Sequence, residues 1–337
     1  MINPIARWLL IVGTALAAPS LSLADSRGRT DYIGLHQVAA SLGLKEKHPL
    51  FSNKVILADQ THRVELKEGS REALVDGQRV FLGDLPVLRD GQLYVSRIDF
   101  DRALTPMLRP DQCNAVPPRP RVIVLDPGHG GIDNGAENKR LGLVEKECAL
   151  DVAFRLKKLL EQAGWQVVLT RDRDIKIELA ERAAKANRAH ADLFLSIHFN
   201  SLPKDTKTNG SEIFTFTPQF QLSTRAWSPG EADDSEKEAA PVNRFDQWSA
   251  VFSKTLGVQI LTRLKTFDRG KKTAHFGMLR GLNCPGALIE SGFISNEAEG
   301  NKIATAQYRQ QIAEAMLAGI RSYSTLLDSL RSKTAVR

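Results

Sequence analysis

The chain has 337 residues, of which 42% are hydrophobic and 25% are charged, and its formal net charge is +7. These values exclude a fully disordered chain and leave room for two domains of ordinary size. A basic chain favours acidic partners. However, no cluster of Lys and Arg is dense enough to line a nucleic-acid groove, so a nucleic-acid partner is not expected.

Residues 1–24 have the pattern of a secretory signal. Arg7 supplies the positive start, residues 8–18 supply an apolar run, and the small residues at 22–24 suit a cleavage site. The apolar run is shorter than the roughly 20 residues that span a membrane. We therefore expect an exported protein without a membrane span in its mature chain; an uncleaved anchor is the alternative.

Residues 28–106 predict a small β-rich α+β domain. A short helix at 35–44 ends near Gly43, and a second helix is expected at 97–108. Asp76-Gly77 is a strong hairpin signal between two extended runs. The runs that alternate like strands are 53–58, 62–67, 71–82 and 91–99.

This N-terminal region resembles the small repeat domain found at the start of copper amine oxidases and of many bacterial envelope proteins. The similarity rests on "YIGLHQVAASLGL", "ALVDGQRVFL" and "LYVSRIDF". It implies a module for binding or positioning, and it implies no copper chemistry. Residues 107–120 follow with four prolines, a composition typical of a semi-extended linker.

From residue 121 to about 328 the chain alternates strands with helices, which predicts an α/β fold with a mainly parallel twisted sheet covered by helices on both faces. The segment at about 218–245 is polar and proline-containing, and we expect it to form an exposed loop. The expected strands are 121–126, 165–171, 191–200 and 286–293, and the expected helices are 145–164, 177–190, 247–266 and 305–330.

Ionisable residues stand where these strands end. His129 follows the first strand, His198 lies near the end of the third, Glu290 lies in the last, and Glu145 opens the first helix. Because ligands bind at the carboxyl ends of strands in open α/β sheets, these side chains are expected to meet there. A histidine at a strand end is also often structural, but an ionised glutamate in an apolar strand is costly unless it is paired or binds a metal.

Two histidines and a glutamate form a known catalytic zinc set with a fourth position open for water, and a second glutamate can then act as general base. A phosphate-binding loop is the weaker interpretation of the glycine-rich turn. "GHGGIDNG" matches neither GxxxxGK[ST] nor GxGxxG, and no lysine stands where phosphate binding needs it. The HExxH motif is absent as well.

The region at about 121–328 resembles the zinc-dependent N-acetylmuramoyl-L-alanine amidases, which are bacterial cell-wall hydrolases. The matching stretches occur in family order. The resemblance implies that His129, Glu145 and His198 bind one Zn2+ and that Glu290 is the catalytic carboxylate. The stretches are "VIVLDPGHGGIDNGA", "EKECAL", "LTRDRD", "LAERAAKAN", "ADLFLSIHFNS", "DRGKK" and "CPGALIESGFISNEAE".

Other residues near these motifs are predicted to have further roles. Asn200 is predicted either to orient substrate or to cap a turn, and His275 is predicted to border the substrate groove. Glu147 lies on another helix face from Glu145 and is a poor substitute ligand. Arg171 and Arg182 match family positions and are expected to form structural ion pairs.

The sequence thus predicts hydrolysis of the amide between N-acetylmuramic acid and L-alanine in peptidoglycan, by an autolysin located in the periplasm or the cell wall. Peptidoglycan is the expected partner, and a protein activator is a further hypothesis. Two alternatives stay open: a zinc peptidase acting on the stem peptides, and a non-catalytic wall-binding protein. The glycines around His129 are expected to aim this residue at the metal and to leave room for a bulky glycopeptide.

Overall fold

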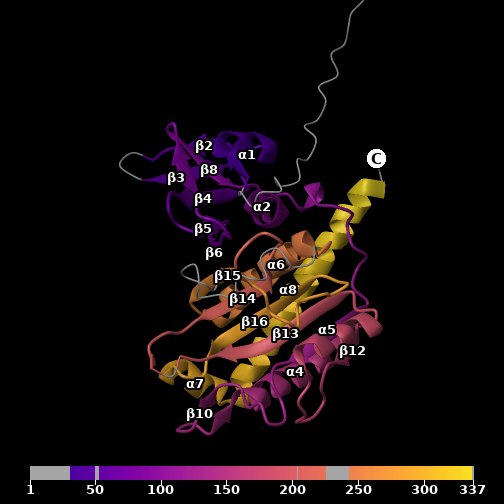
Figure 1. Ribbon diagram of the computed structural model, residues 1–337. Helices are drawn as coiled ribbons and strands as arrows, with labels where there is room; N and C mark the ends of the chain where they lie inside the picture. The colour runs from indigo at the N-terminus through magenta and orange to yellow at the C-terminus, as the bar shows by residue number, and fades with distance from the viewer. Residues whose placement is uncertain (1–30, 50–52, 203, 225–242, 336–337) are drawn as a thin grey trace, which may run out of the picture.

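Figure 1 shows the computed structural model, which describes residues 31–49, 53–202, 204–224 and 243–335. The predicted signal at 1–24 and residues 225–242 of the predicted loop lie outside the described residues. Among the helices that the structure describes, none is long and apolar enough to cross a membrane.

The N-terminal region has the predicted short helix and strands. Helix α1 ends at Gly43, which adopts a left-handed conformation, as glycine does readily. Asp76 and Gly77 both have positive φ angles in the predicted hairpin turn. The elements are β1 (Tyr32–Gly34), α1 (Leu35–Leu42), β2 (Lys45–Lys47), β3 (Lys54–Ala58), β4 (Arg63–Lys67), β5 (Glu72–Val75), β6 (Gln78–Phe81), β7 (Val87–Arg89), β8 (Gln92–Ser96), α2 (Arg97–Asp99), the π-helical turn η1 (Phe100–Leu104), α3 (Thr105–Leu108) and the 3-10 turn η2 (Pro110–Gln112).

The C-terminal region alternates strands and helices, as predicted. Its elements are β9 (Val122–Pro127), β10 (Glu137–Asn138), β11 (Leu143–Val144), α4 (Glu145–Gln162), β12 (Gln166–Leu169), α5 (Leu179–Arg188), β13 (Leu193–Asn200), β14 (Ser211–Phe216), α6 (Asp246–Leu264), β15 (Asp268–Ala274), β16 (Gly286–Phe293), α7 (Glu297–Ile303) and α8 (Ala306–Ala335).

One sheet runs through both regions in the order β12-β9-β13-β16-β14-β15-β6-β5-β4-β3-β2. Strands β12, β9, β13 and β16 are parallel, as expected, but β14 is antiparallel to β16. The sequence analysis did not predict β14 or β15. Strand β15 reads "DRGKKTA", which lacks the apolar alternation of a strand, so its place depends on pairing with β14 and β6.

The two faces of the C-terminal sheet are covered unequally. Helices α4, α6 and α8 pack on one face over a large core that includes Leu195 and Ile289. The residues that alternate with these along the same strands, such as Phe194 and Leu288, point to the other face. They pack with α5 and with the turn before β16. The helices therefore lie on both faces, and the face that carries α5 is the more open one.

Strands β2 to β6 of the N-terminal region continue this sheet, whereas β1, β8 and β7 form a separate three-stranded sheet. Strand β6 pairs in parallel with β15, with Val80 opposite Lys271. In Figure 1, β6 lies beside β15 at the boundary between the lobes. Lys271 is buried at this junction near two buried carboxylates, Asp99 and Asp246, from the N-terminal lobe and α6.

The predicted linker at 107–120 is packed against the C-terminal lobe. Its first residues belong to helix α3, where Met107 and Leu108 are buried in the N-terminal core. Farther on, Asn114 N donates to Gln247 Oε1 at 3.0 Å, and Trp248 Nε1 donates to the Asn114 carbonyl at 3.1 Å. The start of the predicted exposed loop is also packed, since Gln221 is buried.

Candidate metal centre

The turn after β9 places His129 at the carboxyl edge of the sheet. His129 has a φ of 59°, an uncommon conformation for a residue other than glycine and one that often marks a functional site. Gly130 and Asp133 close the turn with two backbone hydrogen bonds. The Asp133 carboxylate lies 2.9 Å from Nδ1 of His129, which leaves Nε2 directed toward Glu145 at 3.1 Å. Asp133 therefore orients the ring.

Two buried arginines, Arg171 and Arg182, hold the main chain of this turn in place. Arg182 pairs with the buried carboxylate of Asp126 at 2.8 Å, as predicted, and it also donates to the carbonyls of Pro127 and His129. The expectation of an ion pair is wrong for Arg171. Its guanidinium instead donates to the main-chain carbonyls of Pro127, Gly128, Lys146 and Arg173. A guanidinium has five N–H donors, so it can tie several carbonyls of one turn together.

Glu145 is held at the first turn of α4, where the helix dipole favours a negative charge. Its Oε2 accepts a hydrogen bond from Ala136 N at 2.8 Å. Its Oε1 accepts from Phe199 N at 3.1 Å and lies 2.9 Å from Nδ1 of His198. Glu147 is exposed on another side of the same helix, so the structure brings Glu145 to the histidines and leaves Glu147 away from them.

His129, Glu145 and His198 converge on one point. Each offers a ligand atom, and these atoms all lie within 4.8 Å of one another. Nε2 of His198 is buried and has no hydrogen-bond partner among the described residues, which is an unusual state for a buried polar atom. A metal ion bound by these residues would satisfy it. Two imidazoles and one carboxylate suit zinc, so the residues present fit the expected metal.

The surroundings of Glu145 favour its ionised form, which is the form that binds a cation. Burial alone would raise the pKa of Glu145, but hydrogen bonds with His129 and His198 outweigh it and hold that pKa well below its usual range. Burial alone would lower the pKa of the His129 imidazole, but its hydrogen bonds to Glu145 and Asp133 raise that pKa overall. A metal must therefore compete with a proton for His129.

Gly128 and Gly135 have no side chain at the points where two of the converging side chains lie. A Cβ on Gly128 would lie 2.3 Å from Cε1 of His198, and a Cβ on Gly135 would lie 2.6 Å from Oε2 of Glu145. Both distances are too short for real contacts. From the sequence, the glycines around His129 are expected to leave room for substrate. The structure shows that Gly128 and Gly135 leave room for two of the converging side chains.

Glu290 lies beside this cluster on β16, half-buried and directly opposite His198 in the parallel register. Opposite residues point to the same face of a sheet, so Glu290 faces the same side as His198. Glu212 on β14 is opposite Glu290 in turn. Asn200 donates to Glu212 at 2.6 Å, and its Oδ1 accepts from Ser201 N.

His275 is not brought to this cluster. It follows the carboxyl end of β15 and packs edge-on against Phe216, 5.6 Å between ring centroids. Because β14 and β15 run opposite to β16, this end of β15 lies at the far edge of the sheet from His198. His275 therefore lies away from the three converging residues, and its place beside a substrate groove stays a prediction.

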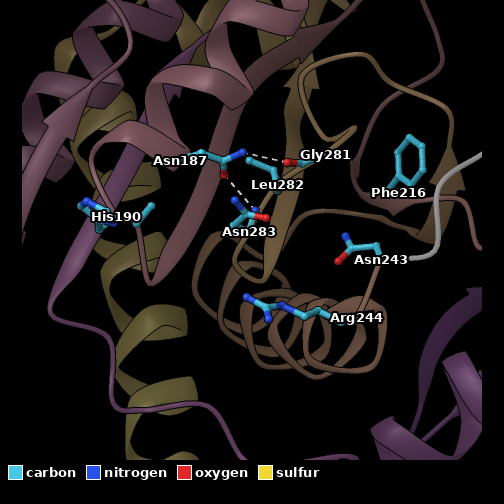
Figure 2. Close-up of a pocket in the computed structure, with 9 residues that line it drawn as sticks. Asn187, His190, Phe216, Asn243, Arg244, Gly281, Leu282 and Asn283 are labelled. Atoms are coloured by element: carbon cyan, nitrogen blue, oxygen red, sulfur yellow. Dashed lines mark hydrogen bonds between the residues drawn. The ribbon is translucent and has the colours of Figure 1, made fainter.

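A cavity of about 680 Å³ also opens at this far edge, as Figure 2 shows. Asn187 spans part of its wall by donating to the Gly281 carbonyl and accepting from Asn283 N, both at 2.8 Å. His190 and Arg244 line it as well. Ligands of open α/β sheets bind at the carboxyl edge of the strands, so the converging site and not this cavity is the candidate for chemistry.

Comparison with known proteins agrees with this geometry. Residues 123–322 match the sequence profile of the N-acetylmuramoyl-L-alanine amidase family. The chain belongs to this family. These amidases are enzymes.

Individual relatives support the assignment over the same region. The chain is 35% identical over 223 residues to the amidase AmiC of Escherichia coli O6:H1, covering 61% of this chain but only 53% of that protein. It is 32% identical over 235 residues to AmiA of Escherichia coli K12, covering 64% of this chain and 81% of that protein. The crystal structure of an amidase from Clostridium difficile 630 superimposes with a TM-score of 0.50 at 32% identity, covering 61% of this chain and 97% of that one.

Two residues that hold this candidate site in place, Asp133 and Glu212, are not predicted from the sequence. Asp133 stands inside a quoted family stretch, so a signal is present there, but only the structure shows that it contacts His129. Glu212 gave no signal, because its position opposite Glu290 depends on β14, which was not predicted.

Proposed function

We propose that this chain hydrolyses the amide bond between N-acetylmuramic acid and L-alanine in peptidoglycan, at one zinc ion held by His129, Glu145 and His198. The single observation that carries the proposal is the convergence of these three ligand atoms within 4.8 Å at the carboxyl edge of the sheet. Membership of the amidase family supports the choice of bond.

Zinc bound there would supply Lewis-acid polarisation of the scissile carbonyl and a water of lowered pKa. The chain's own residues do the rest. Glu290 is the general base that accepts the proton of the attacking water, and it then delivers that proton to the leaving amine of L-alanine. Asp133 keeps the His129 ring in its ligand orientation, and the bonds to Glu145 from Ala136 and Phe199 fix the carboxylate.

The first experiment is a digestion of purified sacculi with and without a zinc chelator, read by mass spectrometry. Release of peptides that begin with L-alanine, with intact sugars left behind, supports the amidase. Cleavage within the stem peptides would identify a zinc peptidase instead. Binding to sacculi without any release would identify a wall-binding protein.

A variant of Glu290 distinguishes loss of the general base from loss of the bound metal. Glu290→Gln should keep bound zinc and lose about 10²- to 10⁴-fold in turnover, the range of general-base catalysis. The matched control is Glu314→Gln, which changes an exposed glutamate on α8 and should leave turnover unchanged. Normal turnover of Glu290→Gln would contradict its role.

We also propose that the protein acts outside the cytoplasm, in the periplasm or at the cell wall, because its proposed substrate lies there. The activator suggested by the sequence analysis stays a prediction. Comparing sacculus digestion by the purified protein alone and with extract from its own host tests it, and equal rates would contradict it.

A further inference from the structure

The face of the sheet that carries Glu290 continues into the N-terminal region. Glu212 lies opposite Glu290, and two positions along β14 Phe214 lies opposite Lys272 of β15. The Lys272 ammonium then lies 5.2 Å from the ring centroid of Phe81 on β6. Side chains of the catalytic face therefore meet side chains of the N-terminal lobe on the same side of one sheet.

Beyond β6 this side of the sheet is rich in cations. In β3 to β6 the apolar residues that point to the other side, including Val64 and Val80, are buried in the N-terminal core. The registers place two carboxylates, Glu65 and Glu72, on the outer side with six cations. We name these six the cationic face: Lys45, Lys47, Lys54, Arg63, Lys67 and Arg79.

The cationic face is accessible. Lys45 and Lys47 are exposed on the edge strand β2, and Lys67 is exposed on β4. Glu65 is shared by Lys54 and Arg63, at 3.3 and 3.0 Å, so it neutralises only part of their charge. With strands about 4.8 Å apart, the face extends roughly 30 Å from the strand of Glu290. This length is within reach of an extended polymer that leaves the metal centre along this side of the sheet.

We propose that the cationic face binds the carboxylate-bearing stem peptides of the peptidoglycan strand whose scissile bond lies at the metal centre. This inference rests on the proposed function. Two observations carry it: the face is continuous with the side of the sheet that holds Glu290, and its excess of positive charge is complementary to carboxylates. The six cations are spread over several strands with two glutamates among them, an arrangement that suits separated carboxylates better than a dense phosphate backbone.

The test measures sacculus binding of the Glu290→Gln protein, so that no turnover is needed. In this background, Lys45→Glu, Lys47→Glu and Lys67→Glu together should weaken binding about tenfold at low salt, because each exposed charge contributes a small amount. The difference should shrink at 1 M salt, where charges are screened beyond roughly 3 Å.

The matched control reverses three exposed cations on helices of the opposite side, with Lys158→Glu, Arg321→Glu and Lys333→Glu. It makes the same change in net charge and should leave binding within about twofold of the parent. Equal weakening by both triple variants, or none by the first, overturns the proposal. Both triple variants should keep the melting temperature of the parent.

Two further arms identify the ligand. Glycan strands from which the stem peptides have been removed should bind equally to the first triple variant and its parent. If bare glycan or double-stranded DNA shows the same dependence on the cationic face, carboxylate recognition is wrong. Failure of the proposed function looks different: the wild-type protein would release no peptide from sacculi, whatever the cationic face binds.

Discussion

Two clusters of buried charge in this protein have opposite electrostatic character. In the metal centre, hydrogen bonds hold the pKa of Glu145 well below its usual range in spite of burial. At the junction of β15 and β6, burial raises the pKa of Asp246 to about 7 and that of Asp99 to about 6, and it lowers the pKa of Lys271 to about 8.

The difference lies in what surrounds each carboxylate. Both oxygens of Glu145 have partners within 3.1 Å, and two of these partners are the imidazoles that would bind a metal together with it. The pKa of Asp246 is raised mainly by desolvation, and the charges of Arg102 and Lys271 lower it by smaller amounts. A buried carboxylate is thus kept ionised where a cation is to bind, and it is pushed toward its neutral form where two lobes pack.

The largest effect is expected from Glu145→Gln, which removes the anionic ligand. Zinc content after dialysis should fall to background, and amidase activity should fall by more than about 10³-fold, because a neutral amide is a poor zinc ligand. Glu147→Gln changes an exposed neighbour and should leave both unchanged. Full zinc occupancy of Glu145→Gln by metal analysis would contradict the assignment.

Next in size is the effect of Arg182→Met on stability. This change leaves the buried Asp126 carboxylate without its cation, which typically costs about 3–5 kcal/mol of unfolding free energy. Arg188→Met on the same helix removes an exposed cation and should cost less than about 0.5 kcal/mol. Denaturant unfolding measures both, and equal losses would show that Arg182 is not the support we describe.

A smaller effect is expected from Asp133→Asn, because Asp133 is not one of the three converging residues and orients one of them, His129. Loss of a carboxylate that orients a histidine ligand typically weakens metal binding about 10- to 100-fold. Chelator competition measures zinc affinity without reference to activity. Asp172→Asn is the control, since it is an exposed aspartate outside the turn. Unchanged affinity in Asp133→Asn would mean that the ring needs no such support.

The last prediction concerns how the unfolding free energy depends on pH through Asp246, at the junction of β15 and β6. Because the folded-state pKa of Asp246 is raised from 3.8 to about 7, the folded protein binds this proton more tightly, and unfolding free energy falls as pH rises from about 4 through 7. Asp246→Asn should reduce this fall between pH 5 and 7.5 by about 2 kcal/mol. Asp328→Asn, an exposed change, should not. An unchanged pH profile would contradict the burial argument.

Much of the catalytic lobe was predictable from sequence, because its parallel strands are buried apolar runs between amphipathic helices. The four ionisable residues stood out for a related reason: Glu290 and His198 interrupt such runs. Strand β15 was not predictable, since "DRGKKTA" has no apolar periodicity and is a strand through its neighbours. The continuity with β6 depends on one register pair between distant segments, which no local pattern encodes.

That pairing also protects an edge. Without β6, β15 would be the last strand of the catalytic sheet and would present unpaired N–H and C=O groups to other chains. Edge strands of this kind favour strand-to-strand association between molecules. The N-terminal lobe therefore acts as a cap on the catalytic sheet, and a chain that begins at residue 121 would gain a self-association edge when it lost its first lobe.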